Sequence, residues 1–411
     1  MEVMYKRCSG LDIHKKSIYA CVVIKEEQKR EKHLARFGTM TADILQLGDW
    51  LRSWKVERVG MESTGVYWKP IWNLLEEQFS LELINAEHIK KVPGRKTDVK
   101  DSEWIAELLQ HGLVRGSFVP VQPQRDLREL TRYRVGLCED KARVANRIQK
   151  VLEDANIKLA SVASDILGAS GRAIVEALIE GEQDAEKLAE LAKHVLRKKI
   201  PELRQALAGK VRDHHRFLLR QLLDEVKFLE GKIERIDRHI GKQMSPFQWA
   251  ITLLTSIPGV SEITAWVLVA EIGVLMEQFG EAQNLASWGG LCPGNWESAG
   301  KRLRGTTHGG NPWLRRALNQ AAWAATRKKG SYLAARFRRL AARRGVKRAL
   351  LATAHKILII AFYLLKKQCG FSDLGENYLQ QKQSASLTRS LVRRLERLGH
   401  KVTLETLPQA A

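Results

Sequence analysis

Between Ser298 and Ser372 the 411-residue chain contains no Asp and no Glu, although Lys and Arg recur throughout this stretch. A solvated surface ordinarily mixes charges of both signs, so the missing acids argue against a merely solvated face and favour contact with a polyanion. The whole chain carries a net charge of +22. Nucleic acid is therefore the first candidate partner, and an anionic membrane surface is the alternative.

The chain also lacks the patterns of membrane, secreted and zinc-binding proteins. No apolar run reaches membrane-spanning length, the longest lying near residues 357–365, and no secretory signal precedes the first predicted strand. The cysteines show no paired spacing, which excludes a disulfide framework and predicts reduced thiols in the cytoplasm. They are Cys8, Cys21, Cys138, Cys292 and Cys369.

Four carboxylates stand out in the first quarter of the chain. Asp12 ends a strand-like run over 7–11, Glu62 ends another over 56–61, and Asp98 and Asp101 open a predicted helix. Carboxylates at the ends of neighbouring strands can converge, and a separation of three places the last two on one helical face. Four oxygen donors in one place would repel one another without divalent cations such as Mg²⁺. A pair of such ions commonly activates phosphodiester chemistry.

Each of these acids also has an ordinary structural explanation. A surface Asp at the end of a strand is common, and Asp near a helix N-terminus is favoured by capping and by the helix dipole. The prediction of a metal site therefore depends on the set of four and on its order along the chain.

Residues 1–120 predict an α/β domain with a mixed sheet. Three strand-like runs are followed by an amphipathic helix, and then by strand, helix, strand and helix. This order, with acids after the first and fourth strands and on a later helix, resembles the ribonuclease H/RuvC-like nuclease fold. The basic run over 90–96 precedes Asp98, either as a solvated loop or as a phosphate clamp.

Residues 121–245 predict helices without strands. Arg132, Arg134 and Arg147 recur along a helix that begins near Leu127, either as part of a solvated face or, with Tyr133 between them, as a nucleic-acid contact. A later heptad seam predicts a coiled coil that packs within one chain or joins two chains, and we favour self-association. Its residues are Leu219, Leu222, Val226, Leu229, Ile233, Ile236 and Ile240.

Residues 246–375 predict a helical domain with a basic surface, followed by a basic tail over 376–411. Ile257-Pro258-Gly259 resembles a helix-hairpin-helix turn, although Ser261 stands where a second glycine is usual, and a plain helical turn is the alternative. Ser298 lies in a Gly-rich loop between predicted helices, where it is either a turn residue or a nucleophile. The neighbouring candidates for nucleic-acid contact are Lys301, Arg302, Arg304, Arg315 and Arg316.

Together these segments resemble the DEDD transposases of bacterial insertion sequences, the insertion-sequence-110 family. The resemblance spans nearly the whole chain. It is carried by Gly10-Leu11-Asp12, Met61-Glu62-Ser63-Thr64-Gly65, Lys96-Thr97-Asp98-Val99-Lys100-Asp101, Ile257-Pro258-Gly259 and Glu297-Ser298-Ala299-Gly300-Lys301.

The resemblance implies a RuvC-like catalytic domain whose acids Asp12, Glu62, Asp98 and Asp101 bind Mg²⁺. It implies that Ser298 is a nucleophile that forms a 5′-phosphoserine link to DNA. It further implies guidance by a structured non-coding bridge RNA that pairs with target and donor DNA, and a homo-oligomer, dimer or tetramer, in which the acids of one protomer meet the serine of another. Such a protein would work in the bacterial cytoplasm in association with the nucleoid.

Two other functions are compatible with the residues. A RuvC-like nuclease that uses water as the nucleophile would keep the acids without needing Ser298. A nucleic-acid-binding protein on a degenerate nuclease scaffold would need neither, although the presence of all four acids argues against it.

Overall fold

The computed structural model describes residues 3–26, 29–62, 65–84, 98–114, 116–293, 296–298, 301–304, 307 and 309–404. For residues 29, 98–100, 296–298, 301–304 and 380–387 it describes the backbone alone. The chain forms two compact units, Met1–Gln122 and Pro123–Ala411, which are treated separately below. The predicted subdivision of the second part into helical, transposase and tail regions remains a prediction.

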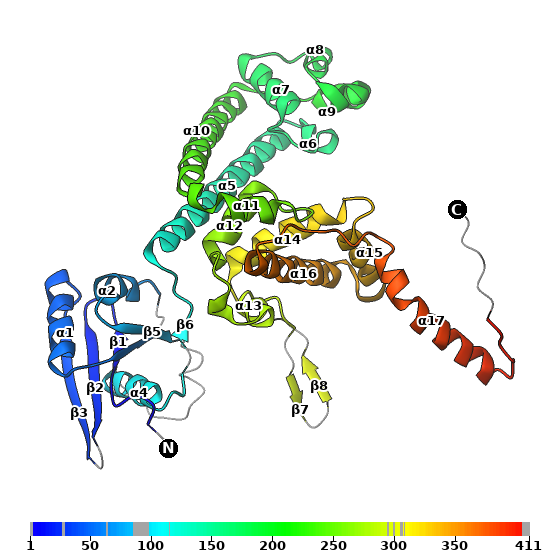
Figure 1. The fold of residues 1–411 in the computed structure, drawn as a ribbon. Coiled ribbons are helices and arrows are strands. Elements are labelled where there is room, and N and C mark those ends of the chain that lie inside the picture. The colour runs from blue at the N-terminus through cyan, green and yellow to red at the C-terminus, as the bar shows by residue number, and fades with distance from the viewer. Residues whose placement is uncertain are drawn as a thin grey trace. The chain divides into compact units, whose positions relative to one another are not determined.

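The first unit is built on a six-stranded sheet in the order β3-β2-β1-β4-β5-β6 (Figure 1). Strand β1 pairs antiparallel with β2 and parallel with β4, which confirms the predicted mixed sheet. Only β6 was not predicted, because two residues carry no readable alternation. The strands are β1 (Arg7–Ile13), β2 (Ile18–Glu26), β3 (Lys29–Phe37), β4 (Arg58–Glu62), β5 (Ser80–Ile84) and β6 (Gly116–Ser117).

Helices cover both faces of this sheet because successive side chains of a strand point to opposite faces. Leu11 and Ile13 of β1 pack with buried residues of α1 (Thr41–Ser53) and α2 (Trp68–Leu75). Cys8, from the other face of β1, packs with buried residues of α4 (Asp98–Gln110). The predicted helices of this unit are thereby confirmed.

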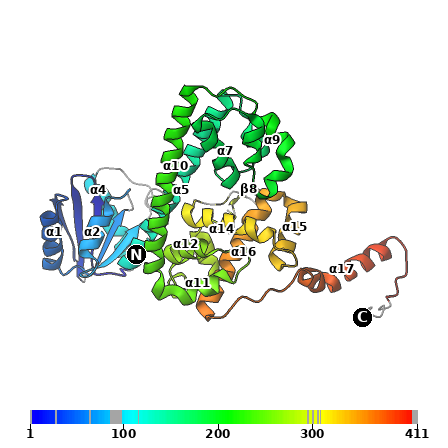
Figure 2. The same cartoon turned by 90° about the horizontal axis from the view of Figure 1, so that it is seen from above.

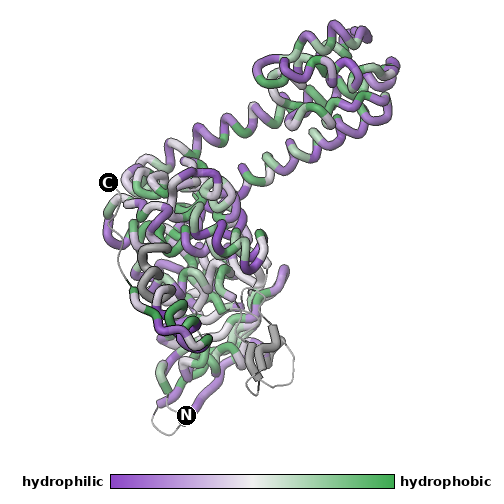
Figure 3. Tube along the Cα trace, turned by 90° about the vertical axis from the view of Figure 1, so that its right-hand side faces the viewer, coloured by the Kyte–Doolittle hydropathy of each residue, from purple (hydrophilic) through white to green (hydrophobic). Residues whose placement is uncertain are grey.

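The second unit begins with two long helices, α5 (Gln122–Asp154) and α10 (Asp213–Gln243), which carry smaller helices at one end (Figure 2). Hydrophobic and hydrophilic residues alternate along both long helices (Figure 3), as expected where one stripe of each is buried. The small helices are α6 (Leu159–Val162), α7 (Ala169–Glu180), α8 (Ala185–Glu190), η1 (His194–Lys199) and α9 (Ile200–Leu207).

An ion pair joins α7 to α10. Arg172 donates hydrogen bonds of 3.0 and 2.7 Å to the two carboxylate oxygens of Glu230. These hydrogen bonds hold the pKa of Glu230 below its usual value. The pair therefore stabilises this contact as long as the carboxyl group is ionised.

The heptad seam of α10 finds its partners within the chain. Leu219, Val226 and Leu229 belong to one buried cluster with residues of α5 and α7, and Ile233 and Ile236 pack against the same cluster from partly buried positions. Packing within one chain, the alternative to self-association, is therefore what the structure shows for this seam. A second chain is not needed to cover it.

Much of the rest of the unit packs around α16 (Val346–Lys367), a long helix whose buried residues extend over most of its length. By length and composition alone it could cross a membrane, which corrects the expectation that no segment reaches spanning length. Buried residues along it include Ile357, Leu358 and Phe362, as in the core helix of a globular domain. The other elements are η2 (Ser245–Phe247), α11 (Gln248–Thr255), α12 (Glu262–Ile272), η3 (Glu277–Phe279), α13 (Ala282–Trp288), β7 (Trp296–Ser298), β8 (Lys301–Arg304), α14 (Pro312–Thr326), α15 (Tyr332–Arg344) and α17 (Tyr378–Arg397).

The turn between α11 and α12 explains the serine that departs from the helix-hairpin-helix pattern. Gly259 has a positive φ of 87°, and a Cβ added there would lie 2.2 Å from the carbonyl oxygen of Ala321 on α14. Ser261 is the N-cap of α12, and its side chain accepts a hydrogen bond from the backbone N–H of Thr264. Both residues thus have a packing or capping role within the chain.

Candidate active site

Asp12 and Glu62 lie at the carboxyl ends of two neighbouring parallel strands. The register of β1 and β4 pairs Gly10 with Gly60 and Leu11 with Met61, so the two acids follow at the same level. Each acid is two residues beyond a paired glycine, and both side chains therefore belong to the face that α4 covers. The structure brings these two predicted residues together.

Helix α4 approaches this face so closely that it requires glycine in β1. A Cβ added at Gly10 would lie 2.2 Å from the carbonyl oxygen of Ser102 and 2.5 Å from the backbone nitrogen of Ala106. At Gly60 an added Cβ would lie 3.1 Å from Cγ2 of Ile105. The two glycines therefore seat α4 directly on the strands that carry the acids.

The contacts of α4 show that it runs antiparallel to β1. The backbone N–H of Met4 donates to the carbonyl oxygen of Gln110 at 2.9 Å, while Sγ of Cys8 lies 3.4 Å from the carbonyl oxygen of Ala106. Two further residues of strand rise by about 6.6 Å, and four residues of helix rise by about 6 Å. Gly10 contacts Ser102, and Asp12 lies two residues further along β1. The first turn of α4, up to four residues before Ser102, therefore lies at the level of Asp12.

That first turn contains the other two predicted acids. Helix α4 begins at Asp98, as the sequence predicts, and Asp101 is half-buried one turn later. The side chain of Asp98 lies outside the described part, as does the basic run over 90–96. The backbone thus positions all four acids at one end of the sheet, while the side chains are described for three of them.

His14 is a neighbour of the site that the sequence reasoning missed. Its Nε2 lies 3.0 Å from Oδ2 of Asp12, and its ring meets the ring of Tyr19 edge-on at 6.1 Å. Asp12 is only 6% exposed, so a hydrogen-bond partner lowers the cost of burying its carboxylate. The signal was available: His14 lies two residues after Asp12 and so shares its face of the extended chain.

The donor set suits a hard divalent cation. Carboxylate oxygens are the ligands such ions prefer, and Asp12 and Glu62 present them from rigid strand ends. Among the side chains that the structure describes, no three His, Cys, Asp or Glu groups are close enough to bind a metal ion. The Asp98 side chain is not in that set.

Ser298 lies in the second unit, in a hairpin between α13 and α14. Strands β7 and β8 pair antiparallel, with Ser298 opposite Lys301, where the sequence predicts a Gly-rich loop between helices. A bridge between Pro293 and Thr307 lies at the base of the hairpin. The side chains of Ser298, Lys301, Arg302 and Arg304 are outside the described part, so their predicted roles stay predictions.

A buried carboxylate holds the chain that leaves this hairpin. Glu271 on α12 is 0% exposed and accepts a 2.6 Å hydrogen bond from Nδ2 of Asn311. Oδ1 of Asn311 accepts hydrogen bonds of 3.0 Å from the backbone N–H groups of Trp313 and Leu314, which caps α14. One side chain thus joins α12 to the start of α14.

Two arginines of α5 neutralise Glu271. Arg132 donates two hydrogen bonds of 2.8 Å to its carboxylate oxygens, and Nε of Arg128 lies 3.6 Å from Oε2. Burial lowers the pKa of Arg128 to about 10, and the nearby Glu271 opposes that shift. This cluster, formed by Glu271, Arg128, Arg132 and Asn311, is called the Glu271 cluster below.

Several arginines predicted to contact nucleic acid are engaged within the chain. Arg132 belongs to the Glu271 cluster, Arg134 pairs with Asp237, and Arg316 pairs with Glu139. Such pairs give these arginines a structural role, and a contact with nucleic acid remains a prediction for them.

The other two described candidates are placed more loosely. Arg147 is exposed and lies 4.0 Å from Glu225, while Arg315 is half-buried in α14. Their contact with nucleic acid likewise remains a prediction.

Comparison with known proteins finds two family models and two relatives, all of them transposases. The family model of the DEDD transposases of IS110 elements, a family described as transposases, matches residues 9–157. The family model of the transposase IS116/IS110/IS902 family matches residues 251–338. A probable family 20 transposase of Pseudomonas aeruginosa is 27% identical over 288 residues, which are 69% of this chain and 75% of the relative. A transposase for insertion sequence element IS1111A of Coxiella burnetii is 27% identical over 296 residues, 70% of this chain and 71% of the relative.

The first match contains Asp12, Glu62, Asp98 and Asp101, and the second contains Ser298. The two matched regions together make up more than half of the chain. The chain is therefore a DNA transposase and belongs to the IS110 family of insertion-sequence transposases.

Proposed function

We propose that this transposase cleaves, exchanges and rejoins DNA strands through a covalent 5′-phosphoserine intermediate, guided by a structured non-coding RNA. The observation that carries the proposal is the convergence of Asp12, Glu62 and the first turn of α4 at one end of the sheet. The order β3-β2-β1-β4-β5 further supports the ribonuclease H/RuvC-like assignment. Fold alone does not establish an activity, so the proposal depends on the site.

Asp12, Glu62, Asp98 and Asp101 would hold Mg²⁺. The DEDD transposases generally use a divalent metal, and the donors here are all carboxylate oxygens. When bound, the ion supplies polarisation of the scissile phosphate and neutralises its charge. Asp12 is held by His14 on one side, while Gly10 and Gly60 keep α4 against the strands, so the chain itself orients the site.

Ser298 would be the nucleophile. Its hydroxyl oxygen forms a bond to phosphorus, the bond from phosphorus to the 3′ oxygen breaks, and the serine proton leaves with that oxygen as a 3′-hydroxyl. One phosphodiester is thereby exchanged for another, so strands can rejoin without a high-energy cofactor. Lys301, opposite Ser298 in the hairpin, and Arg302 and Arg304 would stabilise the phosphate charge.

The partners would be target and donor DNA, the guide RNA and further copies of this chain. The acids and Ser298 belong to two separate compact units, which allows the acids of one protomer to act with the serine of another. The acid-free stretch from Ser298 to Ser372 would lie along the nucleic acid, with Arg315 among its contacts. Such a protein would act in the cytoplasm, in association with the nucleoid.

A covalent-trapping assay tests the proposal. Protein, element-derived RNA, Mg²⁺ and end-labelled target duplex are resolved on a denaturing gel, with Ser298→Ala and Asp12→Asn in parallel. We expect a slowly migrating protein–DNA adduct that both variants lose. Ser287→Ala and Asp49→Asn, at exposed positions, are the matched controls and should keep it.

Other outcomes would point to the alternatives. Cleaved DNA without an adduct, unaffected by Ser298→Ala, would identify a RuvC-like nuclease that uses water. Binding without cleavage, insensitive to Asp12→Asn, would identify a non-catalytic nucleic-acid-binding protein. An adduct that forms equally well without the RNA would remove the guided part of the proposal.

A further inference from the structure

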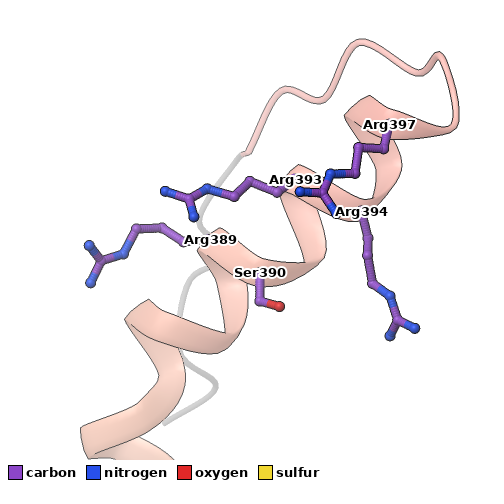
Figure 4. A pocket seen from close by; sticks show the side chains of 5 residues that line it. All are labelled: Arg389, Ser390, Arg393, Arg394 and Arg397. Carbon is purple, nitrogen blue, oxygen red and sulfur yellow. The ribbon is translucent and has the colours of Figure 1, made fainter.

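Helix α17 carries a cluster of arginines that lies beyond the matched family regions. It spans 20 residues, and its second half contains Arg389, Arg393, Arg394 and Arg397, all exposed. These residues and Ser390 line a polar hollow of about 540 Å³ (Figure 4). This set of four arginines is called the α17 arginine cluster.

Two arginines of the cluster, Arg393 and Arg397, differ from several arginines of the other helices in this unit. Arg132, Arg134 and Arg172 each bind a carboxylate of a neighbouring helix. In the described part of the chain, no acidic side chain forms an ion pair with Arg393 or Arg397. Glu396 is the only acidic residue of the sequence between Tyr378 and Arg397, so this part of the sequence carries an excess of positive charge.

The start of α17 is attached to the rest of the unit. The ring of Tyr378 meets the ring of Tyr332 on α15 edge-on at 5.8 Å, and Nη2 of Arg338 lies 3.3 Å from Oε2 of Glu376. From Arg389 onward, by contrast, most side chains are exposed. The helix is thus anchored at its first turn and presents its arginines to solvent.

We propose that the α17 arginine cluster binds the phosphate backbone of duplex DNA. This inference rests on the activity on DNA of the proposed function, and it adds a binding site outside the catalytic unit and the serine hairpin. Arginine is the side chain best suited to phosphate, because its planar guanidinium donates two parallel hydrogen bonds to phosphate oxygens.

The arrangement of the arginines favours a groove. Arg389, Arg393 and Arg397 recur every fourth residue and span about 12 Å, a length over which duplex DNA carries about seven charges. Arg394 is displaced by about 140° around the helix from Arg389. In Figure 4 Arg389 and Arg394 point away from each other, as suits a helix that lies between two phosphate strands.

A membrane surface fits the same helix less well. Leu391, Leu395 and Leu398 are exposed, and a basic helix with an apolar stripe can lie on a bilayer. Helices of that kind commonly insert aromatic anchors, and residues 389–400 contain none. On a membrane-bound helix the charged residues lie on the side opposite the apolar stripe, whereas the four arginines also extend beyond that side.

The salt dependence of DNA binding tests the proposal. Affinity for a random-sequence 30-base-pair duplex is measured by fluorescence anisotropy from 50 to 300 mM NaCl, with EDTA present. Each lost phosphate contact lowers the slope of log K against log salt by about 0.9, so Arg393→Gln with Arg397→Gln should lower it by about 1.8. Because no metal is present, failure here is separate from failure of strand cleavage.

A matched control removes the same charge elsewhere. Arg197 and Arg204 are exposed and lie 3.5 and 3.6 Å from Glu190. Their replacement by Gln should leave the slope unchanged. Arg393→Lys with Arg397→Lys, which keeps the charge, should keep most of the slope, and circular dichroism should show equal helix content in all variants.

Three results would overturn the proposal. The first is an unchanged slope for the double Gln variant. The second is an equal decrease in the control, which would show that net charge alone matters. The third is a double Gln variant that binds DNA as the parent does but has lost affinity for a structured RNA hairpin or for phosphatidylserine vesicles, both measured in parallel.

Discussion

Removing the charge of Glu271 should destabilise the second unit substantially. Glu271→Gln keeps the size of the side chain but leaves Arg128, whose side chain is 12% exposed, without a counter-charge. Removing one partner of a buried ion pair costs 3–5 kcal/mol in general. Arg132 is 35% exposed and can be hydrated again, so we expect a loss near the lower end, about 3 kcal/mol.

This loss converts into a measurable temperature shift. A domain of this size loses roughly 2–4 °C of Tm per kcal/mol, so the Tm of the second unit should fall by roughly 6–12 °C in differential scanning calorimetry of the whole chain. Glu281→Gln removes the same charge from an exposed position of the same unit and should change stability by less than about 0.5 kcal/mol.

A double-mutant cycle separates the ion pair from other effects of the substitution. Arg132→Gln combined with Glu271→Gln should be less destabilising than the sum of the two single variants, because the partners are lost together. If Glu271→Gln left the Tm within 1 °C of the parent, or if the two substitutions were additive, the reasoning about the Glu271 cluster would be refuted.

Three further predictions concern packing, cysteine reactivity and pH. Gly10→Ala should destabilise the first unit by about 1–3 kcal/mol in calorimetry and abolish strand cleavage, because the added Cβ would overlap the backbone of α4. The control Gly136→Ala should be neutral or stabilising, because a Cβ added at Gly136 would meet no atom within 4 Å. Burial raises the pKa of the Cys8 thiol to about 12. Iodoacetamide at pH 8 should therefore label the exposed Cys369 in the native protein but Cys8 only after unfolding. Labelling of Cys8 in the native protein would contradict its burial. The pKa of Glu230 is lowered in the folded protein, so its ionised carboxylate contributes stability above the unfolded pKa of about 4.5, and this stability is lost as the pH falls through the lower folded pKa. The Tm of the parent should therefore fall more steeply with decreasing pH than the Tm of Glu230→Gln. Parallel curves of Tm against pH for the two proteins would contradict the ion pair.

Local pattern was enough to predict the helices of the first unit and every strand of its sheet except β6. Alternation over β1 and β2 and helical spacing over α1 are properties of short stretches, which a sequence displays directly. The start of α4 at Asp98 was predicted in the same way. The family was also accessible from sequence, because its motifs are short and contiguous.

Interpretations that depend on partners far along the chain were less secure. The α10 seam has a heptad pattern whether it packs on α5 or on a second chain, and only the fold shows that α5 and α7 cover it. The apolar length of α16 likewise does not distinguish a core helix from a spanning one.

By itself, the sequence of this chain determined most elements of the first unit, which acids end the strands and which stretch is purely basic. The tertiary structure decided what those residues meet: His14 beside Asp12, α4 seated on Gly10, and Arg132 paired with Glu271 from 139 residues away. The physical reason is that propensity and periodicity act within one or two turns of a segment, whereas ion pairs and close packing join segments that only the folded chain brings together.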